Sequence, residues 1–77
     1  MKKNKLTTSF VKAVLHQMEC LYASEIRIGK FQFIVVGDQY SVTYKDGAEE
    51  TVIVEKDPKK FIDRIKCSAL YGLTLVD

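Results

Sequence analysis

The chain has 77 residues, of which 47% are hydrophobic, and its 12 basic and 10 acidic residues give a net charge of +2. A chain of this length forms one domain and buries only about 60% of the surface that its unfolded form exposes, so its stability is marginal. The near balance of charge does not demand a polyanionic partner. No apolar stretch is long enough to span a bilayer.

Residues 1–6 are predicted to form a short basic arm, followed by a single α+β domain over residues 7–77. The arm resembles the basic end of an export signal. However, Lys12 and His16 interrupt the apolar run after it, and Glu19 follows. We therefore expect no export and a cytoplasmic protein.

A first helix is predicted to begin near Thr7, Thr8 or Ser9, which are favoured N-cap residues. The side opposite its apolar stripe is polar, so this helix of roughly four turns is amphipathic and packs one side on the core. The stripe recurs at helical spacing and consists of Phe10, Val14, Met18 and Leu21.

Alternating residues after this helix predict the first strand. Isoleucines occupy the even positions in residues 25–28, whereas Phe31, Phe33 and Val35 occupy odd positions. A bulge or bend at Gly29 would bring both sets to one face of this strand.

The pair Gly37-Asp38 predicts a tight connection into the second strand, and Asp46-Gly47 predicts the hairpin that follows it. We expect a three-residue loop, residues 45–47, in which Gly47 takes the left-handed position of a G1 bulge. This loop gives one mainly apolar and one mainly polar face, whereas a two-residue Asp46-Gly47 turn would mix them. The expected cross-strand pairs are Tyr44 with Ala48, Val42 with Glu50, and Tyr40 with Val52.

Asp57 and Pro58 mark the start of a second helix, because aspartate is a favoured N-cap and proline suits the first helical position. Gly72 is placed to end this helix in a left-handed cap. The last residues, 73–77, are too apolar for a free tail and predict a short extended C-terminal segment. The buried stripe of the helix is predicted to contain Phe61, Ile62, Ile65 and Ala69, with Leu70 beside it.

The predicted fold is therefore α+β, in the order helix, three-stranded antiparallel meander, helix, with both helices on one face of the sheet. Strand alternation leaves three large apolar residues on the other face, Ile34, Val36 and Ile53. Either residues 73–76 cover them, or they are scattered exposed side chains, or this face binds a protein partner or a second copy. We expect a homodimer through this face. The residues expected to face the helices are Phe31, Phe33, Val35, Tyr40, Val42, Tyr44, Val52 and Val54.

Candidate catalytic groups are few. His16 and Cys20 are four residues apart on the first helix, the minimum for a thiolate–imidazole pair or two metal ligands. A structural zinc needs four ligands and a nucleophile needs an orienting group, so a surface histidine beside a half-buried thiol is the preferred interpretation. No glycine-rich loop precedes either helix, so no nucleotide site is predicted. We expect no enzymatic activity, no metal, no cofactor and no small-molecule substrate, with Cys20 and Cys67 reduced.

Basic residues suggest an alternative function. The order helix, three strands, helix resembles the double-stranded-RNA-binding domain, and Lys59-Lys60 at the start of the second helix is similar to the lysine pair that contacts phosphates in that family. Gly37-Asp38 stands where the family has a long loop, and the family's glycine-rich approach to the lysine pair is absent. The resemblance therefore lacks one of the two minor-groove contacts. The predicted nucleic-acid contacts are Lys2, Lys3, Lys5, Lys59, Lys60, Arg64 and Lys66.

The preferred function follows from these exclusions. We expect a small non-catalytic protein-interaction or regulatory module that acts through its sheet face or edge. Accessory or inhibitory proteins of bacteria and their phages are of this size. Nucleic-acid binding is the alternative, and a solvated helix face with mixed charges explains the same lysines without a ligand.

Overall fold

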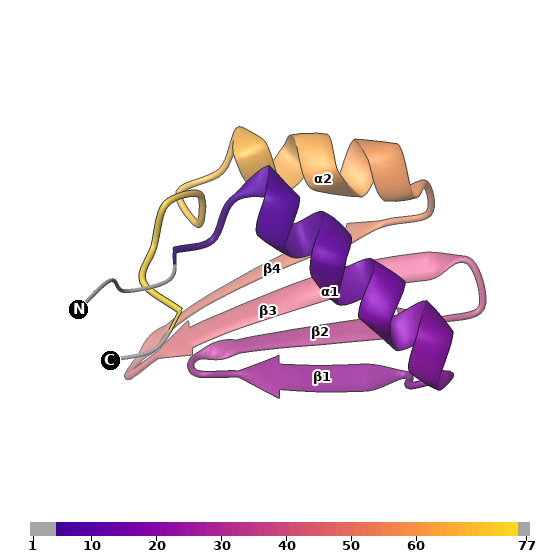
Figure 1. Cartoon of the computed structure of the whole chain (residues 1–77). Coiled ribbons are helices and arrows are strands. Elements are labelled where there is room, and N and C mark those ends of the chain that lie inside the picture. The colour runs from indigo at the N-terminus through magenta and orange to yellow at the C-terminus, as the bar shows by residue number, and fades with distance from the viewer. Residues whose placement is uncertain (1–4, 76–77) are drawn as a thin grey trace.

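In the computed structural model, which describes residues 5–75, two helices pack on one face of a four-stranded antiparallel sheet (Figure 1). The α+β class is as predicted, whereas the sheet has four strands and not three. The strands follow one another in chain order, as a meander. The elements are α1 (Thr8–Leu21), β1 (Glu25–Ile28), β2 (Phe31–Val36), β3 (Gln39–Asp46), β4 (Glu49–Glu55) and α2 (Pro58–Lys66).

Helix α1 begins where the sequence predicts. Thr7 is its N-cap, and the Thr7 hydroxyl accepts a hydrogen bond from the amide of Phe10 at 3.2 Å, which satisfies one of the free amides of the first turn. Leu21, which was expected in the apolar stripe, is instead exposed at the last helical position. The buried side of the helix consists of Val11, Val14 and Met18.

The fourth strand arises at Gly29. Gly29 and Lys30 form a two-residue hairpin loop, closed by the pair Ile28 and Phe31. The predicted bulge within one long strand is therefore wrong, because the chain reverses direction here and pairs with itself. The isoleucines before the turn do reach the same face as the phenylalanines after it, as expected.

The three strand connections are built alike. Gly29, Gly37 and Gly47 each take the first position of a two-residue loop, with φ of +57°, +60° and +63°. Among the described residues of these loops, none at the second position has a positive φ. This combination is typical of the type II′ turn, whose twist matches that of the flanking strands. The other two loops are closed by the pairs Val36 with Gln39 and Asp46 with Glu49.

The register of β3 and β4 differs from both alternatives considered above. The loop is Gly47-Ala48, so Val42 pairs with Ile53. Glycine begins the loop and does not end it, which moves every residue of β4 to the opposite face from the one expected. Ile53 is 5% exposed and lies in the core. The placement of Val52 and Val54 toward the helices was therefore wrong, and so was the placement of Ile53 on the other face.

The core lies between the sheet and the two helices. Helix α1 packs on β1 and against α2, while α2 packs on β4 and β3. The ring of Phe31 lies 4.9 Å from that of Tyr44 and 6.5 Å from that of Phe33, and Tyr40 packs on Phe61 at 6.0 Å between centroids. The buried core residues are Leu6, Val11, Val14, Met18, Phe31, Phe33, Val42, Ile53, Phe61, Ile65, Leu70 and Leu75.

Helix α2 begins as predicted and ends early. Asp57 is the N-cap and accepts a hydrogen bond from the amide of Lys59 at 2.8 Å. The helix ends at Lys66. Beyond it the Ser68 hydroxyl donates to the carbonyl of Ile65 at 2.7 Å and accepts from the amide of Leu70 at 3.1 Å, so local side-chain bonds replace the helical pattern. The cap expected at Gly72 was therefore wrong. Ala69, expected in the buried stripe, is exposed, and Gly72 lies in the turn that follows.

The two ends of the described chain lie side by side. Lys5 and Thr74 form an isolated antiparallel bridge, and the amide of Leu6 donates to the carbonyl of Leu73 at 2.8 Å. Leu6 is fully buried, so it belongs to the core of the domain. Of the basic arm expected over residues 1–6, Leu6 belongs to the core, and residues 1–4 lie outside the described residues.

Candidate functional site

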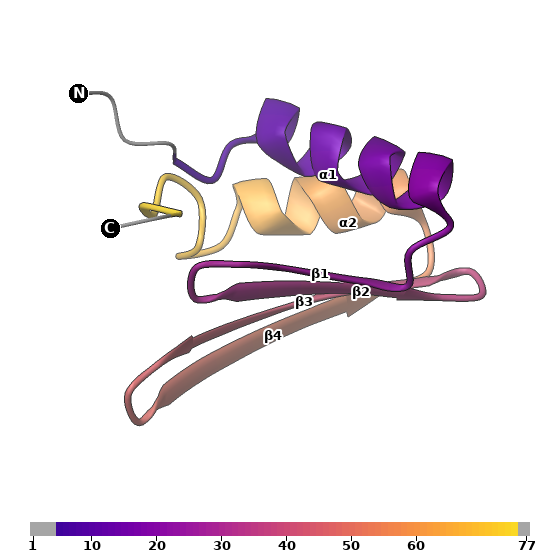
Figure 2. The same ribbon diagram turned by 60° about the horizontal axis from the view of Figure 1, so that its bottom comes forward.

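The face of the sheet opposite the helices, here called the outer face, is the first candidate surface. Figure 2 shows that both helices and the C-terminal segment lie on the other side of the sheet. Leu75, the last described residue, is buried in the core with Leu6, so the described part of residues 73–76 does not cover the outer face. Strand alternation places four branched aliphatic residues there: Ile34 and Val36 from β2, and Val52 and Val54 from β4.

Three of these four side chains are well exposed. Val36 is 66% exposed, Val52 is 52% exposed and Val54 is 41% exposed, whereas Ile34 is half-buried. Single exposed aliphatic residues are normal on a protein surface. Several of them on one uncovered sheet face are a feature of interaction sites.

The predicted interface is thus corrected on β4. Ile34 and Val36 lie on the outer face as expected, but Ile53 belongs to the core and is replaced by its two valine neighbours. A signal for this register is present in the sequence. Three Gly-X pairs recur between strand patterns, and glycine first is the preference of a type II′ loop.

Polar residues of β3 lie between the two aliphatic strips of the outer face. The Ser41 hydroxyl donates to the carbonyl of Ile34 at 3.3 Å. Near the β3–β4 hairpin, a shallow hollow of about 460 Å³ is lined by Arg27, Lys45, Glu50 and neighbouring residues. A partner on this face would therefore meet apolar strips, a polar centre and a rim with both signs of charge.

The β4 edge of the sheet carries charged groups at both of its ends. Arg64 of α2 guards the end of β4, because its Nη1 lies 3.0 Å from the carbonyl oxygen of Val54 and 2.9 Å from Oε2 of Glu55. Glu49 and Glu50 place charge at the other end of this strand. Charged and capped edges discourage the addition of a strand from another chain.

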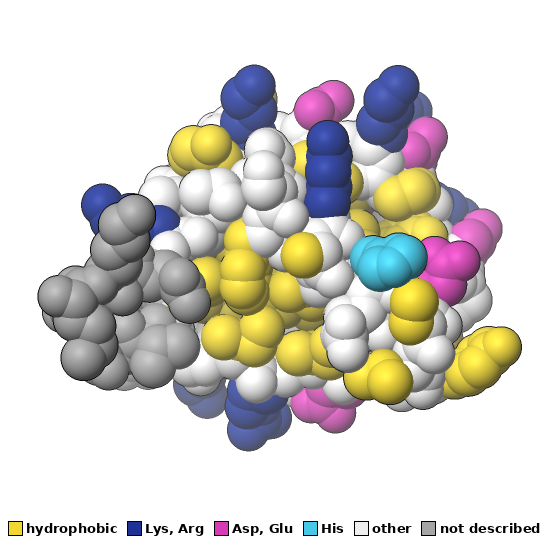
Figure 3. All heavy atoms as spheres, viewed as in Figure 1, with side chains coloured by type: hydrophobic (Ala, Val, Ile, Leu, Met, Phe, Trp, Pro, Cys, Tyr) yellow, Lys and Arg dark blue, Asp and Glu magenta, His cyan; other side chains and the backbone are white. Residues whose placement is uncertain are grey.

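The predicted nucleic-acid contacts that lie within residues 5–75 do not gather on one surface. Lys59 and Lys60 are exposed at the start of α2, whereas Lys5 pairs with the C-terminal segment, which lies at the opposite end of the molecule (Figure 1). Arg64 forms an ion pair with Glu55. Figure 3 shows basic side chains separated by acidic and apolar ones over the helices. Lys66 is exposed at the end of α2, and Lys2 and Lys3 lie outside the described residues.

The helical spacing brings His16 and Cys20 together. His16 Nε2 lies 3.5 Å from Cys20 Sγ, and both side chains are exposed, so the thiol is not half-buried as expected. Within residues 5–75, no group of three histidine, cysteine or acidic side chains could hold a metal ion. Two groups supply neither four metal ligands nor an oriented base with an oxyanion pocket. The pair therefore supports no assignment of chemistry.

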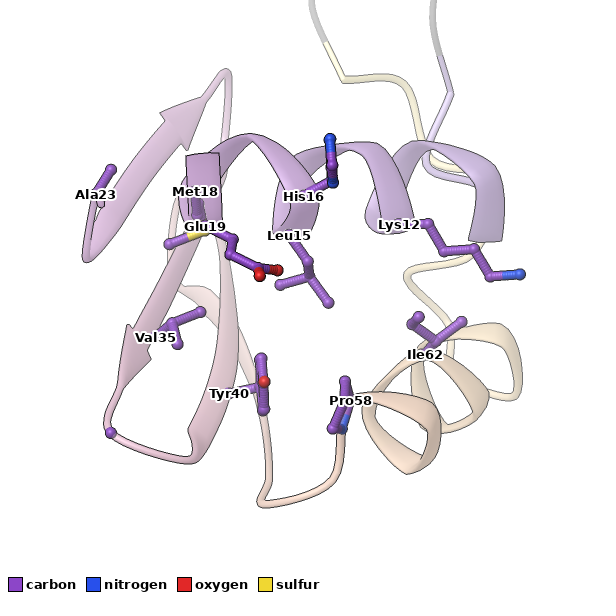
Figure 4. Close-up of a pocket in the computed structure, with 11 residues that line it drawn as sticks. Lys12, Leu15, His16, Met18, Glu19, Ala23, Val35, Tyr40, Pro58 and Ile62 are labelled. Atoms are coloured by element: carbon purple, nitrogen blue, oxygen red, sulfur yellow. The ribbon is translucent and has the colours of Figure 1, made fainter. Parts of the chain in front are cut away.

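A cleft of about 560 Å³ opens between α1, α2 and the adjoining ends of β2 and β3 (Figure 4). Leu15 points into it from α1, toward Tyr40 and Pro58 on the far wall. The helix side of the rim carries Lys12 and Glu19, and neither forms an ion pair with a described residue. Sequence periodicity did not reveal this cleft, because it forms where the β2–β3 hairpin meets two helices that lie far from each other in sequence.

The end of α1 carries the most exposed large hydrophobic side chain of the described structure, Tyr22, at 96%. Tyr22 is also the only non-glycine residue with a positive φ in residues 5–75, at φ +53° and ψ +32°. Its amide donates to the carbonyl of Glu19 at 3.3 Å, and the amide of Ala23 donates to that of Met18 at 2.9 Å. These bonds define a Schellman cap, in which glycine is the usual residue.

The chain matches no protein-family model, no curated protein and no solved structure. The order helix, three strands, helix, which carried the resemblance to the double-stranded-RNA-binding domain, is not the observed order, because β1 adds a strand. No helix in the described part of the chain is long and apolar enough to cross a membrane. A proposal for function therefore depends on the surfaces described above.

Proposed function

We propose that this protein is a small non-catalytic interaction module that binds a partner protein through the outer face of its sheet. The observation that carries this proposal is a set of four aliphatic residues, Ile34, Val36, Val52 and Val54, on a sheet face that no described helix covers. Full burial of one such side chain contributes roughly 1.5–3 kcal/mol. Because these residues are already partly buried, a partner gains a fraction of that from each.

The chemistry of the face favours a protein over a nucleic acid. Its rim carries Arg27 and Lys45 together with Glu25 and Glu50, so it presents no continuous positive charge to a phosphate backbone. An apolar centre with a polar rim is the usual composition of a protein–protein contact. Because Arg64 contacts the end of the β4 edge, we expect a partner to dock on the outer face and not to add a strand at this edge.

The test is affinity capture by the full chain from an extract of its native host, with and without nuclease treatment, followed by quantitative mass spectrometry. The variant Val52→Asp/Val54→Asp places two charges on the outer face. The control Tyr71→Asp places a charge on another exposed hydrophobic residue, in the turn after α2. Unfolding midpoints establish that both variants are folded.

We expect a protein that the wild-type chain and the control retain and that the outer-face variant loses by about tenfold or more, equivalent to 1.4 kcal/mol. Equal retention by all three chains would overturn the proposal. Capture that disappears on nuclease treatment would favour the alternative function, nucleic-acid binding.

A further inference from the structure

The left-handed backbone of Tyr22 costs free energy, and its side chain makes little contact with the described part of the chain. A left-handed backbone brings the Cβ of an L-residue close to the following carbonyl oxygen, which is why glycine prevails at this position of a helix cap. The ring is 96% exposed, so packing within the described chain does not compensate for the strain. Strain without a structural gain suggests a functional constraint.

An exposed aromatic ring suits an interface. Tyrosine is enriched among the residues that contribute most to protein–protein binding, because its ring buries a large area and its hydroxyl keeps a polar contact. Leu21, the residue before it, is 62% exposed and adds to the same protrusion. The end of α1 therefore presents two exposed hydrophobic side chains that residues 5–75 leave largely uncovered.

The cleft between the two helices opens beside the end of α1, next to Tyr22. Glu19 and Ala23, which flank the end of α1, both line the cleft between the two helices. Its volume of about 560 Å³ falls within the usual range of binding sites, about 300–1,000 Å³. The apolar part of its lining consists of Ala23 together with Leu15, Met18, Val35, Tyr40, Pro58 and Ile62.

The charges on the cleft rim are arranged for a twofold contact. Lys12 and Glu19 are seven residues apart on α1, which corresponds to about 10.5 Å along the helix axis. A twofold axis that lies beside α1, perpendicular to the helix and level with the midpoint between them, sets Lys12 of one copy against Glu19 of a second copy, and the reverse. Around the same axis each Tyr22, three residues beyond Glu19, lies beyond Lys12 of the other copy, at the end of the cleft where Ile62 lies (Figure 4).

We propose that the protein recognises a second copy of itself here, with the Tyr22 ring of each chain inserted into the cleft of the other. The two rings bury roughly 150–250 Å² each. A specific interface buries at least about 1,000 Å² in total, so Leu21 and the cleft walls supply the remainder. This contact uses a surface separate from the outer face, so it does not depend on the function proposed above.

The first test is sedimentation equilibrium of the full chain from low to high micromolar concentration. A reductant is present throughout, because Cys20 and Cys67 are both exposed thiols. We expect a reversible dimer of the wild type, and we expect Tyr22→Gly to raise its dissociation constant by about 100-fold or more, since two anchors are lost. The same substitution relieves the left-handed strain, so it should raise the urea midpoint of the monomer.

Tyr71→Ala, at another exposed tyrosine, is the matched control and should leave the dissociation constant unchanged. A wild-type chain that stays monomeric at high micromolar concentration would overturn the proposal. Equal dissociation by Tyr22→Gly and Tyr71→Ala would also overturn it.

The second test removes the Tyr22 ring in one variant and obstructs the cleft in another. Ile62→Lys obstructs the cleft and leaves Tyr22 intact, whereas Tyr22→Gly removes the ring and leaves the cleft intact. If Ile62→Lys does not fold, Pro58→Arg obstructs the cleft in its place. Neither variant should self-associate, but a mixture should form a heterodimer with one anchored tyrosine. A mixture no more associated than its components would overturn the reciprocal arrangement.

Val52→Asp, a single substitution on the outer face, should still dimerise. A dimer that Val52→Asp dissociates and Tyr22→Gly leaves intact would overturn this inference while leaving the outer face as an interaction surface.

Discussion

The inner and outer faces of the sheet are built from the same four strands, yet neighbouring residues on them have opposite environments. On β4, Ile53 is 5% exposed and Val52 is 52% exposed. Both are β-branched aliphatic residues, so side-chain hydrophobicity does not decide which of them is buried. The hairpin loop decides it, because it fixes which residue of β4 faces Val42 on the helix-covered side.

The largest expected effect comes from placing the same charge on either face. Ile53→Asp puts an unpaired carboxylate into the core and should cost more than about 4 kcal/mol, which approaches the whole stability of a small domain. Val52→Asp leaves its carboxylate in water and should cost no more than about 1 kcal/mol. Far-UV circular dichroism with urea titration measures both values. Similar losses from the two substitutions would show that the faces are not distinct.

The core on the inner face also includes the N-terminal segment, and a substitution of Leu6 measures how much this segment contributes to stability. Leu6→Ala removes a fully buried side chain and should destabilise the protein by about 2–5 kcal/mol. Lys5→Ala, one residue earlier and exposed, is the control and should change stability by less than about 0.5 kcal/mol. Equal urea midpoints for the two variants would mean that the segment contributes little to the core.

The smallest expected effect lies in the loop that sets the two faces. Gly47→Ala should cost on the order of 1 kcal/mol, purely through its left-handed backbone, because no atom lies within 4 Å of an added Cβ. Ala48→Gly, at the second loop position, should cost only a few tenths of a kcal/mol. Chemical denaturation gives both values, and a Gly47→Ala variant as stable as the wild type would contradict the type II′ loop.

Local signals in the sequence predicted the parts of the fold that depend on a few neighbouring residues. Thr7 and the pair Asp57-Pro58 begin the helices as expected, because capping is satisfied within one turn. The register of β4 was not predicted correctly, because all residues from Thr51 to Val54 are β-branched and show no apolar–polar alternation. Only the turn could have set it, and Gly47 was assigned to the wrong loop position.

The candidate surfaces were predicted less well than the fold. Ile34 and Val36 were found because β2 alternates with its two buried phenylalanines. Tyr22 was missed, because a left-handed cap is usually recognised by its glycine and the chain has none there. The cleft depends on how α2 lies against α1, which no local pattern encodes.

The repeated two-residue loops have a consequence for the order of folding. Each strand pairs with its neighbour in sequence, so all three hairpins bring together residues already close along the chain. Such hairpins form in about 1–10 μs, and topologies rich in local contacts fold fast. The bridge between Lys5 and Thr74, in contrast, closes a loop that spans almost the whole described chain. We expect the meander to assemble first, the two ends to join it last, and the same junction to open first in native-state hydrogen exchange.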